Sequence, residues 1–373
     1  MFQRIPSHRF FAEYFGILVR QCQPKSCASD RRSNLRSYHM ETEMRPTDHP
    51  NDDTGAGQQP LQVQRIPVIT LSLIAITVVV YMILTLNGGS QNTQVLLRYG
   101  AKDSGLIWEG QYWRLITPIF LHAGLTHLIL NAFSLFQLGS LIEFMYGRTR
   151  MLVIFLASGF LATLASTLAS PNISVGASGA IFGLFGALFY FGLRNPVIFR
   201  AVFGVRIYMV LALNLIMGVV IPNIDSFAHL GGLVGGFVTA FGLGLPRERL
   251  PRSPKTKIAY AVCAAVFFLG FTLYALNPSK NSWRYHYYSG QSLLMRSNYA
   301  RAAERLVRAN ELKPDNEKVA ELAAIALYAD VASKPITVND ASVARAKLKK
   351  ALQLNPQLEE AQALLDRINQ LGP

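Results

Sequence analysis

Apolar and polar residues divide the chain into a polar leader, a long central region of apolar runs and a polar C-terminal region. Each apolar run approaches or reaches the roughly 20 residues with which an α-helix crosses a bilayer. The seven runs are 67–86, 125–146, 151–170, 178–193, 205–221, 226–245 and 257–276. This pattern predicts an all-α, polytopic helical membrane protein.

The composition agrees with a membrane protein. Hydrophobic residues make up 51% of the 373 residues and the mean hydropathy is +0.25, which is too apolar for a water-soluble protein of this size. The net charge of +14 would suit a nucleic-acid partner, but no motif that reads DNA or RNA accompanies it. We therefore predict the lipid bilayer, and no nucleic acid, as a partner.

Lys and Arg residues are concentrated in every second connection between the apolar runs. Those at 147–150, 194–206 and 246–257 are rich in Lys and Arg, whereas 171–177 and 222–225 contain none. Because basic connections stay in the cytosol, the N-terminus is predicted to be cytoplasmic and the C-terminus to lie outside after seven crossings.

The long segment 87–124 then also lies outside. Its Trp108, Tyr112 and Trp113 are amphipathic rings that suit the headgroup layer, so we expect this segment to be partly embedded.

The leader, 1–64, is predicted to be a disordered basic tail. Its first forty residues are Arg-rich and poor in acidic residues, as transit peptides are, and translation from Met1 or from Met40 both stay open. Cys22 and Cys27 lack the further Cys or His ligands, at suitable spacing, that a metal site needs. We predict neither a metal nor a cofactor.

The C-terminal region, 280–373, is polar and helix-favouring. Two stretches, 300–314 and 342–356, align without gaps, and each ends in Leu-x-Pro. They resemble the second helix and terminating proline of a tetratricopeptide repeat, but their separation exceeds the roughly 34 residues of that repeat and implies an insertion near 330–341. The alternative is a pair of amphipathic helical hairpins.

The first candidate for chemistry is Ser178. It lies in Gly176-Ala-Ser-Gly179, at the start of the fourth apolar run. Flanking glycines let backbone and substrate approach closely, and a helix N-terminus offers free N–H groups to a developing negative charge. Alone this signal is weak, because small residues at the end of a membrane helix more often serve helix packing.

His229 enters the sixth run from the same side of the membrane as Ser178. An ionisable residue within a span is costly unless it is partnered or functional; the alternative is a histidine bonded to a backbone carbonyl or water. Glycine pairs on the following turns, Gly231/Gly235 and Gly232/Gly236, would allow close packing against a neighbouring helix, and if that helix is the fourth run, the serine and the histidine can touch. Phe182, one turn after Ser178, is placed to stack on the imidazole, or else faces lipid or the core.

His127 and Asn131 start the second run, which also enters from outside. They are four residues apart and therefore share a helix face. Four polar side chains from three spans thus converge on one outer layer of the membrane, whereas structural polar residues would scatter through its depth.

Taken together, these motifs resemble the rhomboid family of intramembrane serine proteases over about 65–245. The resemblance rests on Gly176-Ala-Ser178-Gly179, Ala228-His229-Leu-Gly-Gly, His127-xxx-Asn131, Trp113-Arg114 and Gly139-xxx-Glu143-xxx-Gly147. A seventh span in 246–279, followed by repeats in 280–373, resembles the bacterial six-plus-one branch. This implies a bacterial inner or plasma membrane location with an extracytoplasmic repeat domain.

The resemblance implies an endopeptidase that cleaves single-span membrane proteins in or near their transmembrane segments by a Ser-His dyad. Ser178 would be the nucleophile and His229 the general base, Asn131 and His127 would stabilise the oxyanion, and Gly176, Gly179 and Phe182 would support the motif. The repeat domain would bind a protein partner.

Three further residues are interpreted as structural. Asp225 is expected to cap the sixth span rather than orient His229. Arg114 is expected to anchor the first loop to headgroups or carbonyls, and Glu143 to cap backbone groups of the Gly147 turn.

Two other classes of protein agree less well with the sequence. An inactive relative that escorts membrane clients would share the fold, but such proteins usually lack the serine or the histidine. A transporter would carry its polar residues near the midplane or in inverted repeats, and neither is seen.

Overall fold

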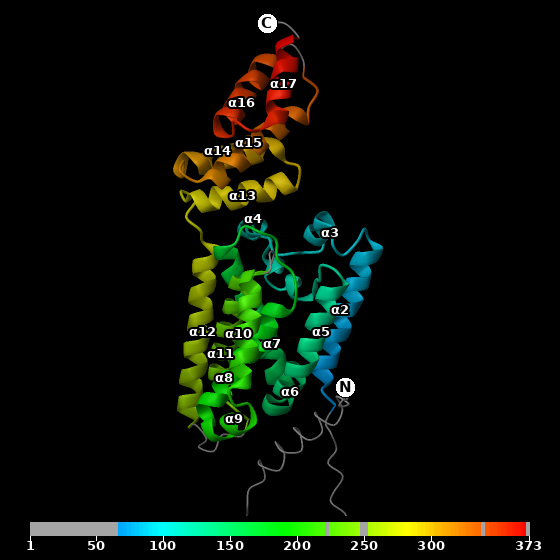
Figure 1. Ribbon diagram of the computed structural model, residues 1–373. Coiled ribbons are helices and arrows are strands. Elements are labelled where there is room, and N and C mark those ends of the chain that lie inside the picture. The colour runs from blue at the N-terminus through cyan, green and yellow to red at the C-terminus, as the bar shows by residue number, and fades with distance from the viewer. Residues whose placement is uncertain (1–65, 221–223, 247–252, 337–339, 371–373) are drawn as a thin grey trace, which may run out of the picture. The chain divides into compact units, whose positions relative to one another are not determined.

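The structure is a computed structural model that describes residues 66–220, 224–246, 253–336 and 340–370 (Figure 1). Within these ranges the chain forms helices and no strand, apart from one isolated antiparallel bridge between Lys102 and Ser174. The predicted tail 1–64, with Met40, Cys22 and Cys27, lies outside the described residues.

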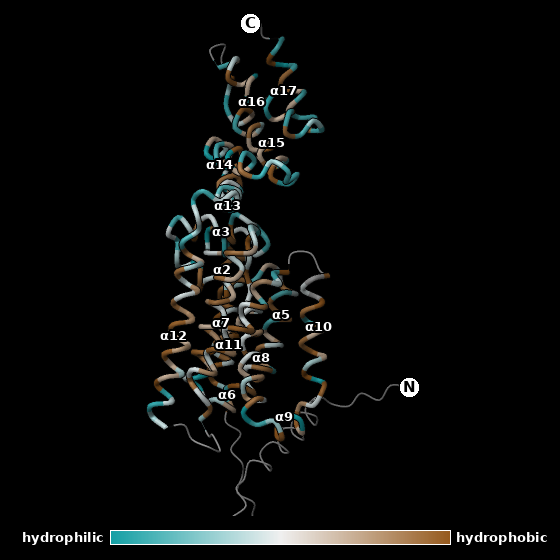
Figure 2. The backbone as a smooth tube through the Cα atoms, turned by 90° about the vertical axis from the view of Figure 1, so that its left-hand side faces the viewer, coloured by the Kyte–Doolittle hydropathy of each residue, from teal (hydrophilic) through white to brown (hydrophobic). Residues whose placement is uncertain are grey.

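Each of the seven predicted spans corresponds to helix. They are α2 (Val68–Leu86), α5 (Leu125–Ser134) continued by the π-helical turn η3 (Leu135–Gly139) and α6 (Ser140–Tyr146), α7 (Arg148–Ala169), α8 (Ser178–Arg194), α10 (Arg206–Val220), α11 (Ser226–Leu243) and α12 (Pro254–Leu276). Figure 2 shows apolar residues along these helices.

The helices differ in whether their length and apolar composition suffice to cross a membrane. Among the described residues, five are long and apolar enough to cross a membrane. A sixth is added if α9 (Pro196–Val202) and α10, which are bent by 75° at their junction, count as one span. Helix α8 is a shorter apolar helix, and it lies in the centre of the bundle with most of its residues buried. The all-α polytopic fold is therefore confirmed.

The crossing of α8 and α11 brings two backbones into direct contact. A Cβ placed on Gly232 would overlap the carbonyl oxygen of Gly179, and one on Gly236 would overlap that of Gly183. In the other direction, a Cβ on Gly186 would overlap the carbonyl oxygen of Leu233. Only glycine allows this approach, so the pair Gly232/Gly236 serves close packing on α8, whereas the pair Gly231/Gly235 faces α7.

Asp225 and Glu143 both act as helix caps. One Asp225 oxygen accepts the Ala228 N–H at 3.0 Å and the other accepts the Ser166 hydroxyl, so the predicted cap of α11 is confirmed. The expectation for Glu143 was wrong. Its carboxylate reaches across to the start of α2 and accepts the N–H groups of Ile69 at 3.1 Å and Thr70 at 2.9 Å, because those first-turn donors lack partners within their own helix.

The segment between α2 and α5 folds into short helices over one end of the bundle. These are α3 (Thr93–Arg98), α4 (Ser104–Trp108), η1 (Tyr112–Leu115) and η2 (Thr117–Phe120). The buried Arg114 donates to the Ala101 carbonyl at 2.8 Å, so the carbonyl alternative for this residue is confirmed.

Trp108 makes contacts within the protein. Its indole N–H donates to the Ala275 carbonyl at 3.0 Å, and its ring stacks on Tyr288 with centroids 5.6 Å apart. The ring therefore joins α4 to the end of α12 and to the C-terminal domain.

The C-terminal region is a stack of antiparallel helices with its own apolar core. Its helices are α13 (Trp283–Met295), α14 (Tyr299–Leu312), α15 (Glu317–Ala332), α16 (Ala341–Leu354) and α17 (Glu359–Gln370). The two aligned sequence stretches coincide with α14 and α16, and alanine and leucine side chains fill the core between the helices. The insertion expected near 330–341 falls partly on residues outside the described ranges.

Helix α13 packs directly on α4. A Cβ placed on Gly105 would lie 2.7 Å from the Cβ of Ser292 and 3.1 Å from the Cα of Ser289. At the edge of this contact, Arg296 pairs with Glu109 at 3.3 Å. The C-terminal domain therefore sits against the same end of the bundle at which Ser178 begins α8.

Candidate active site

Ser178 is the first residue of α8, and the turn before it is tightly held. Gly176 has φ +123°, a conformation that favours glycine, and its N–H donates to the Pro118 carbonyl at 2.8 Å. Because the first N–H groups of a helix have no intrahelical partner, the serine lies beside free backbone donors.

His229 lies in the first turn of α11 and faces Ser178. Its Nε2 is 3.0 Å from the Ser178 hydroxyl oxygen, and the imidazole is buried. The Phe182 ring stacks on the imidazole with centroids 4.1 Å apart and planes 11° from parallel. Within the described chain no group hydrogen-bonds to Nδ1, so Asp225 does not orient the imidazole through this atom.

His127 and Asn131 lie on α5, next to the turn that precedes Ser178. The Asn131 amide donates to the His127 carbonyl at 2.9 Å, and Asn131 is buried. A Cβ placed on Gly176 would lie 2.7 Å from the Nε2 of His127, so the imidazole occupies the space that the glycine leaves.

His122 is a site residue that sequence analysis missed. It is fully buried, its Nε2 accepts the Ala177 N–H at 3.5 Å, and its ring lies 5.1 Å from that of His127. Burial lowers the pKa of His122 to about 4, so it is neutral at pH 7. The sequence feature that could have pointed to His122 is its position five residues before His127.

Lys102 was missed as well. Its side chain is fully buried, and its ammonium donates to the carbonyls of Ser170 at 2.6 Å and Asn172 at 3.0 Å. A single lysine in the segment 87–124 has no pattern that would distinguish it from an exposed charge.

A cavity of about 20 Å³ lies beside Ser178. Lys102, Thr163, Ser166, Gly176, Ser178 and Gly179 are among its lining residues. This volume holds about one water molecule. Among the described residues no group of His, Cys, Asp or Glu is arranged to hold a metal ion.

Together, these features define a polytopic helical membrane protein with a Ser-His pair embedded at one end of its bundle. A family model described as Rhomboid domain matches residues 109–246. Rhomboid protease GluP of Bacillus subtilis is 42% identical over 211 residues, 57% of this chain and 41% of GluP. Putative rhomboid protease YdcA of the same organism is 42% identical over 144 residues, 38% of this chain and 72% of YdcA.

A relative from Arabidopsis thaliana has a similar identity. RHOMBOID-like protein 1 of Arabidopsis thaliana is 40% identical over 150 residues, 39% of this chain and 38% of that protein. The chain belongs to the rhomboid family. It spans less than half the length of GluP and of RHOMBOID-like protein 1.

Proposed function

We propose that this protein is an intramembrane serine endopeptidase that cleaves single-span membrane proteins in or near their transmembrane segments. The observation that carries the proposal is the 3.0 Å contact between the Ser178 hydroxyl and the His229 Nε2, at the starts of two helices in backbone contact. The similarity to rhomboid proteases GluP and YdcA supports it.

In the proposed reaction His229 is the general base. Its Nε2 accepts the hydroxyl proton as the Ser178 oxygen attacks the scissile carbonyl, and the imidazolium then protonates the leaving amine. The resulting acyl-enzyme is hydrolysed by water, which His229 deprotonates in turn. The stacked Phe182 ring supports this role because it holds the imidazole in the plane in which Nε2 faces the serine.

The oxyanion would be stabilised by the Ser178 N–H, His127 and Asn131. An amide group has two N–H donors, and only one Asn131 donor is needed for the bond to the His127 carbonyl. The second is available to an oxyanion. A buried donor of this kind contributes strongly because water does not screen it.

The location follows from charge. The basic connections place the N-terminus in the cytoplasm, and Ser178 and the repeat domain at the outer face. We assign the protein to a bacterial inner or plasma membrane. The contact of α13 with α4 supports a common side for the repeat domain and the active site.

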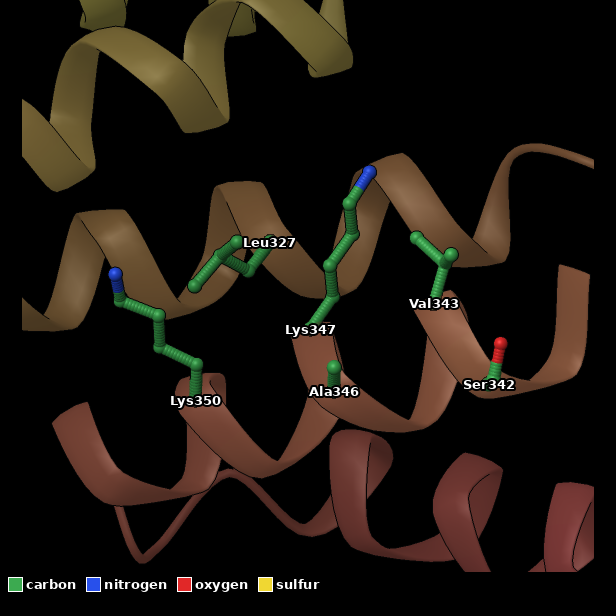
Figure 3. A pocket seen from close by; sticks show the side chains of 6 residues that line it. All are labelled: Leu327, Ser342, Val343, Ala346, Lys347 and Lys350. Atoms are coloured by element: carbon green, nitrogen blue, oxygen red, sulfur yellow. The ribbon is translucent and has the colours of Figure 1, made fainter.

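We also propose a protein partner for the repeat domain. A groove of about 370 Å³ lies between α15 and α16. Figure 3 shows the Lys347 and Lys350 side chains on either side of the apolar Leu327. Lys347 is already paired with Asp330. The apolar floor beside the Lys350 ammonium therefore suits a segment with an apolar side chain next to a carboxylate.

The groove is tested with Lys350→Glu in the full chain. Cleavage of a single-span reporter with an acidic extracytoplasmic segment is expected to fall, and cleavage of a matched reporter with a neutral segment is expected to stay unchanged. Equal cleavage of both reporters by wild type and variant would contradict the recruitment role.

The peptidase is tested in proteoliposomes with a single-span reporter, comparing wild type with Ser178→Ala and His229→Ala at matched abundance. Both substitutions are expected to abolish cleavage, and Ser178→Ala to abolish labelling by a fluorophosphonate. A reporter cut equally by all three proteins would remove Ser178 and His229 from the mechanism.

A further inference from the structure

The Lys102 side chain joins two segments that are far apart in sequence. It extends from the first loop, just before α4, to the end of α7, where its ammonium donates to the Ser170 and Asn172 carbonyls. Ser104 adds a second link, because its hydroxyl donates to the Ser170 carbonyl at 3.1 Å. Carbonyls at a helix C-terminus carry partial negative charge, so they suit an ammonium ion.

Burying this charge is costly, and the surroundings offset the cost only in part. Lys102 is 1% exposed. Asp103 on the first loop and Asp225 at the start of α11 are the charged groups that favour its ammonium form, and burial opposes it. A lysine that serves only packing would be replaced by an apolar residue at lower cost, because a buried charge without a full partner destabilises the fold.

The segment that Lys102 holds leads directly to the nucleophile. The backbones of Lys102 and Ser174 exchange hydrogen bonds of 3.0 Å and 3.2 Å, and two residues later the Gly176 N–H donates to the Pro118 carbonyl. Lys102 and Ser178 both line the same small cavity. The turn before α8 is therefore attached to the first loop.

We propose that Lys102 is a positioning residue for proteolysis: its ammonium holds residues 170–174 against the first loop and thereby fixes the turn that presents Ser178 to His229. This inference rests on the proposed peptidase function. Lys102 acts through the turn and does not touch the reacting atoms. Its loss therefore slows attack by Ser178 while substrate binding along the helices is retained.

The role has a consequence for pH. Burial lowers the pKa of Lys102 to about 8, whereas Asp103 and Asp225 act in the opposite direction. Above this pH the side chain loses its charge, and a neutral amine forms weaker hydrogen bonds to the two carbonyls. The rate of cleavage is therefore expected to fall as pH rises through about 8.

The main test is Lys102→Met in the full chain in proteoliposomes, with cleavage and fluorophosphonate labelling of Ser178 measured from pH 6 to about 10. We expect kcat and the labelling rate to fall about 10-fold or more, with KM within about two-fold of wild type, because the turn loses its anchor and the nucleophile its alignment. The variant should also lack the alkaline fall in rate.

Lys102→Arg tests the positioning role if the Lys102→Met protein does not accumulate in the membrane. An arginine stays charged throughout this pH range, so the alkaline fall should disappear while activity at neutral pH is retained. Lys313→Met, at an exposed site in the C-terminal domain, is the matched control and should equal wild type.

A Lys102→Met protein with wild-type kcat and the wild-type pH profile would overturn the proposal. So would an unchanged alkaline fall in Lys102→Arg. If wild type neither cleaves the reporter nor reacts with the fluorophosphonate, the peptidase function itself fails, and this outcome is distinct because it does not depend on position 102.

Discussion

Glycine lies at several helix contacts in this protein, and two of these contacts differ in what the glycine touches. Between α8 and α11, a Cβ on Gly232 or Gly236 would overlap backbone carbonyl oxygens. Between α13 and α14, a Cβ on Gly290 would lie 2.6 Å from the Cγ of Leu306, which is part of a flexible side chain. The contact between the helices of Ser178 and His229 is therefore fixed by backbone atoms, whereas the contact in the C-terminal domain is adjustable.

Gly236→Ala should have the largest effect. The added methyl group must separate α11 from α8, which moves His229 away from Ser178 because the two side chains lie on these helices. A displacement of about 1 Å at reacting groups is enough to lower the rate about 100-fold. Reporter cleavage by the purified variant in proteoliposomes measures this.

The matched control is Gly270→Ala in α12. A Cβ at this position meets no atom within 4 Å, so activity should be unchanged. A Gly236→Ala protein that cleaves at the wild-type rate would show that the backbone contact does not set the site geometry.

Phe182→Ala should have the next largest effect. It removes the ring that stacks on His229, and such contacts contribute about 0.5–1.5 kcal/mol beyond area burial. With the loss of imidazole alignment, kcat is expected to fall about 10-fold.

Phe182→Tyr tests whether the ring alone is required. It preserves the stack and should retain most of the activity, so the two variants separate ring from hydroxyl. Equal kcat values for Phe182→Ala and wild type would exclude an alignment role for the ring.

The sequence predicted the helices of the bundle because membrane spans are read from local composition. It also indicated that Ser178 and His229 meet, since charge asymmetry put both at one face and the glycines allowed close approach. The capping role of Asp225 was also predictable from local sequence, because this residue directly precedes the helix that it caps.

Long-range partners were not predictable in this way. Glu143 bonds to α2, about 70 residues earlier in the chain, and the sequence favoured the nearby Gly147 turn. Lys102 and Trp108 contact residues that lie much later in the sequence, at Ser170 and Tyr288. No periodicity records such contacts, because they depend on the tertiary path of the first loop.

In the C-terminal domain, Asp330→Asn tests a charged contact away from Ser178 and His229. The buried Asp330 accepts from Lys334 at 2.8 Å and from Lys347 at 2.5 Å. The variant should lower local stability by about 1–3 kcal/mol, because hydrogen bonds to a charged group are lost. Hydrogen exchange of α15 amides at pH 7 measures this, and cleavage of a neutral reporter should not change.

The same contact predicts a pH dependence. Burial alone would raise the pKa of Asp330, but the hydrogen bonds from the two lysines outweigh it, and the net direction is down from 3.8. Asp330 therefore contributes stability above this unfolded-state pKa, and the contribution is lost as pH falls through the lower folded-state value. The difference between wild type and Asp330→Asn should narrow in this acidic range, and a difference that grows there would contradict the assignment.

Gly290→Ala should have a smaller effect than Gly236→Ala, Phe182→Ala or Asp330→Asn. The Leu306 side chain must move to admit the methyl group, which costs about 1–3 kcal/mol in a tightly packed core, while replacing a mid-helix glycine by alanine returns about 1 kcal/mol. The two free-energy terms nearly cancel because the Leu306 side chain can adopt another rotamer. The backbone carbonyl next to Gly236 cannot move in this way. Hydrogen exchange of α13 and α14 should therefore change little, and strong deprotection of both helices would show that this contact is as rigid as the one that holds the active site.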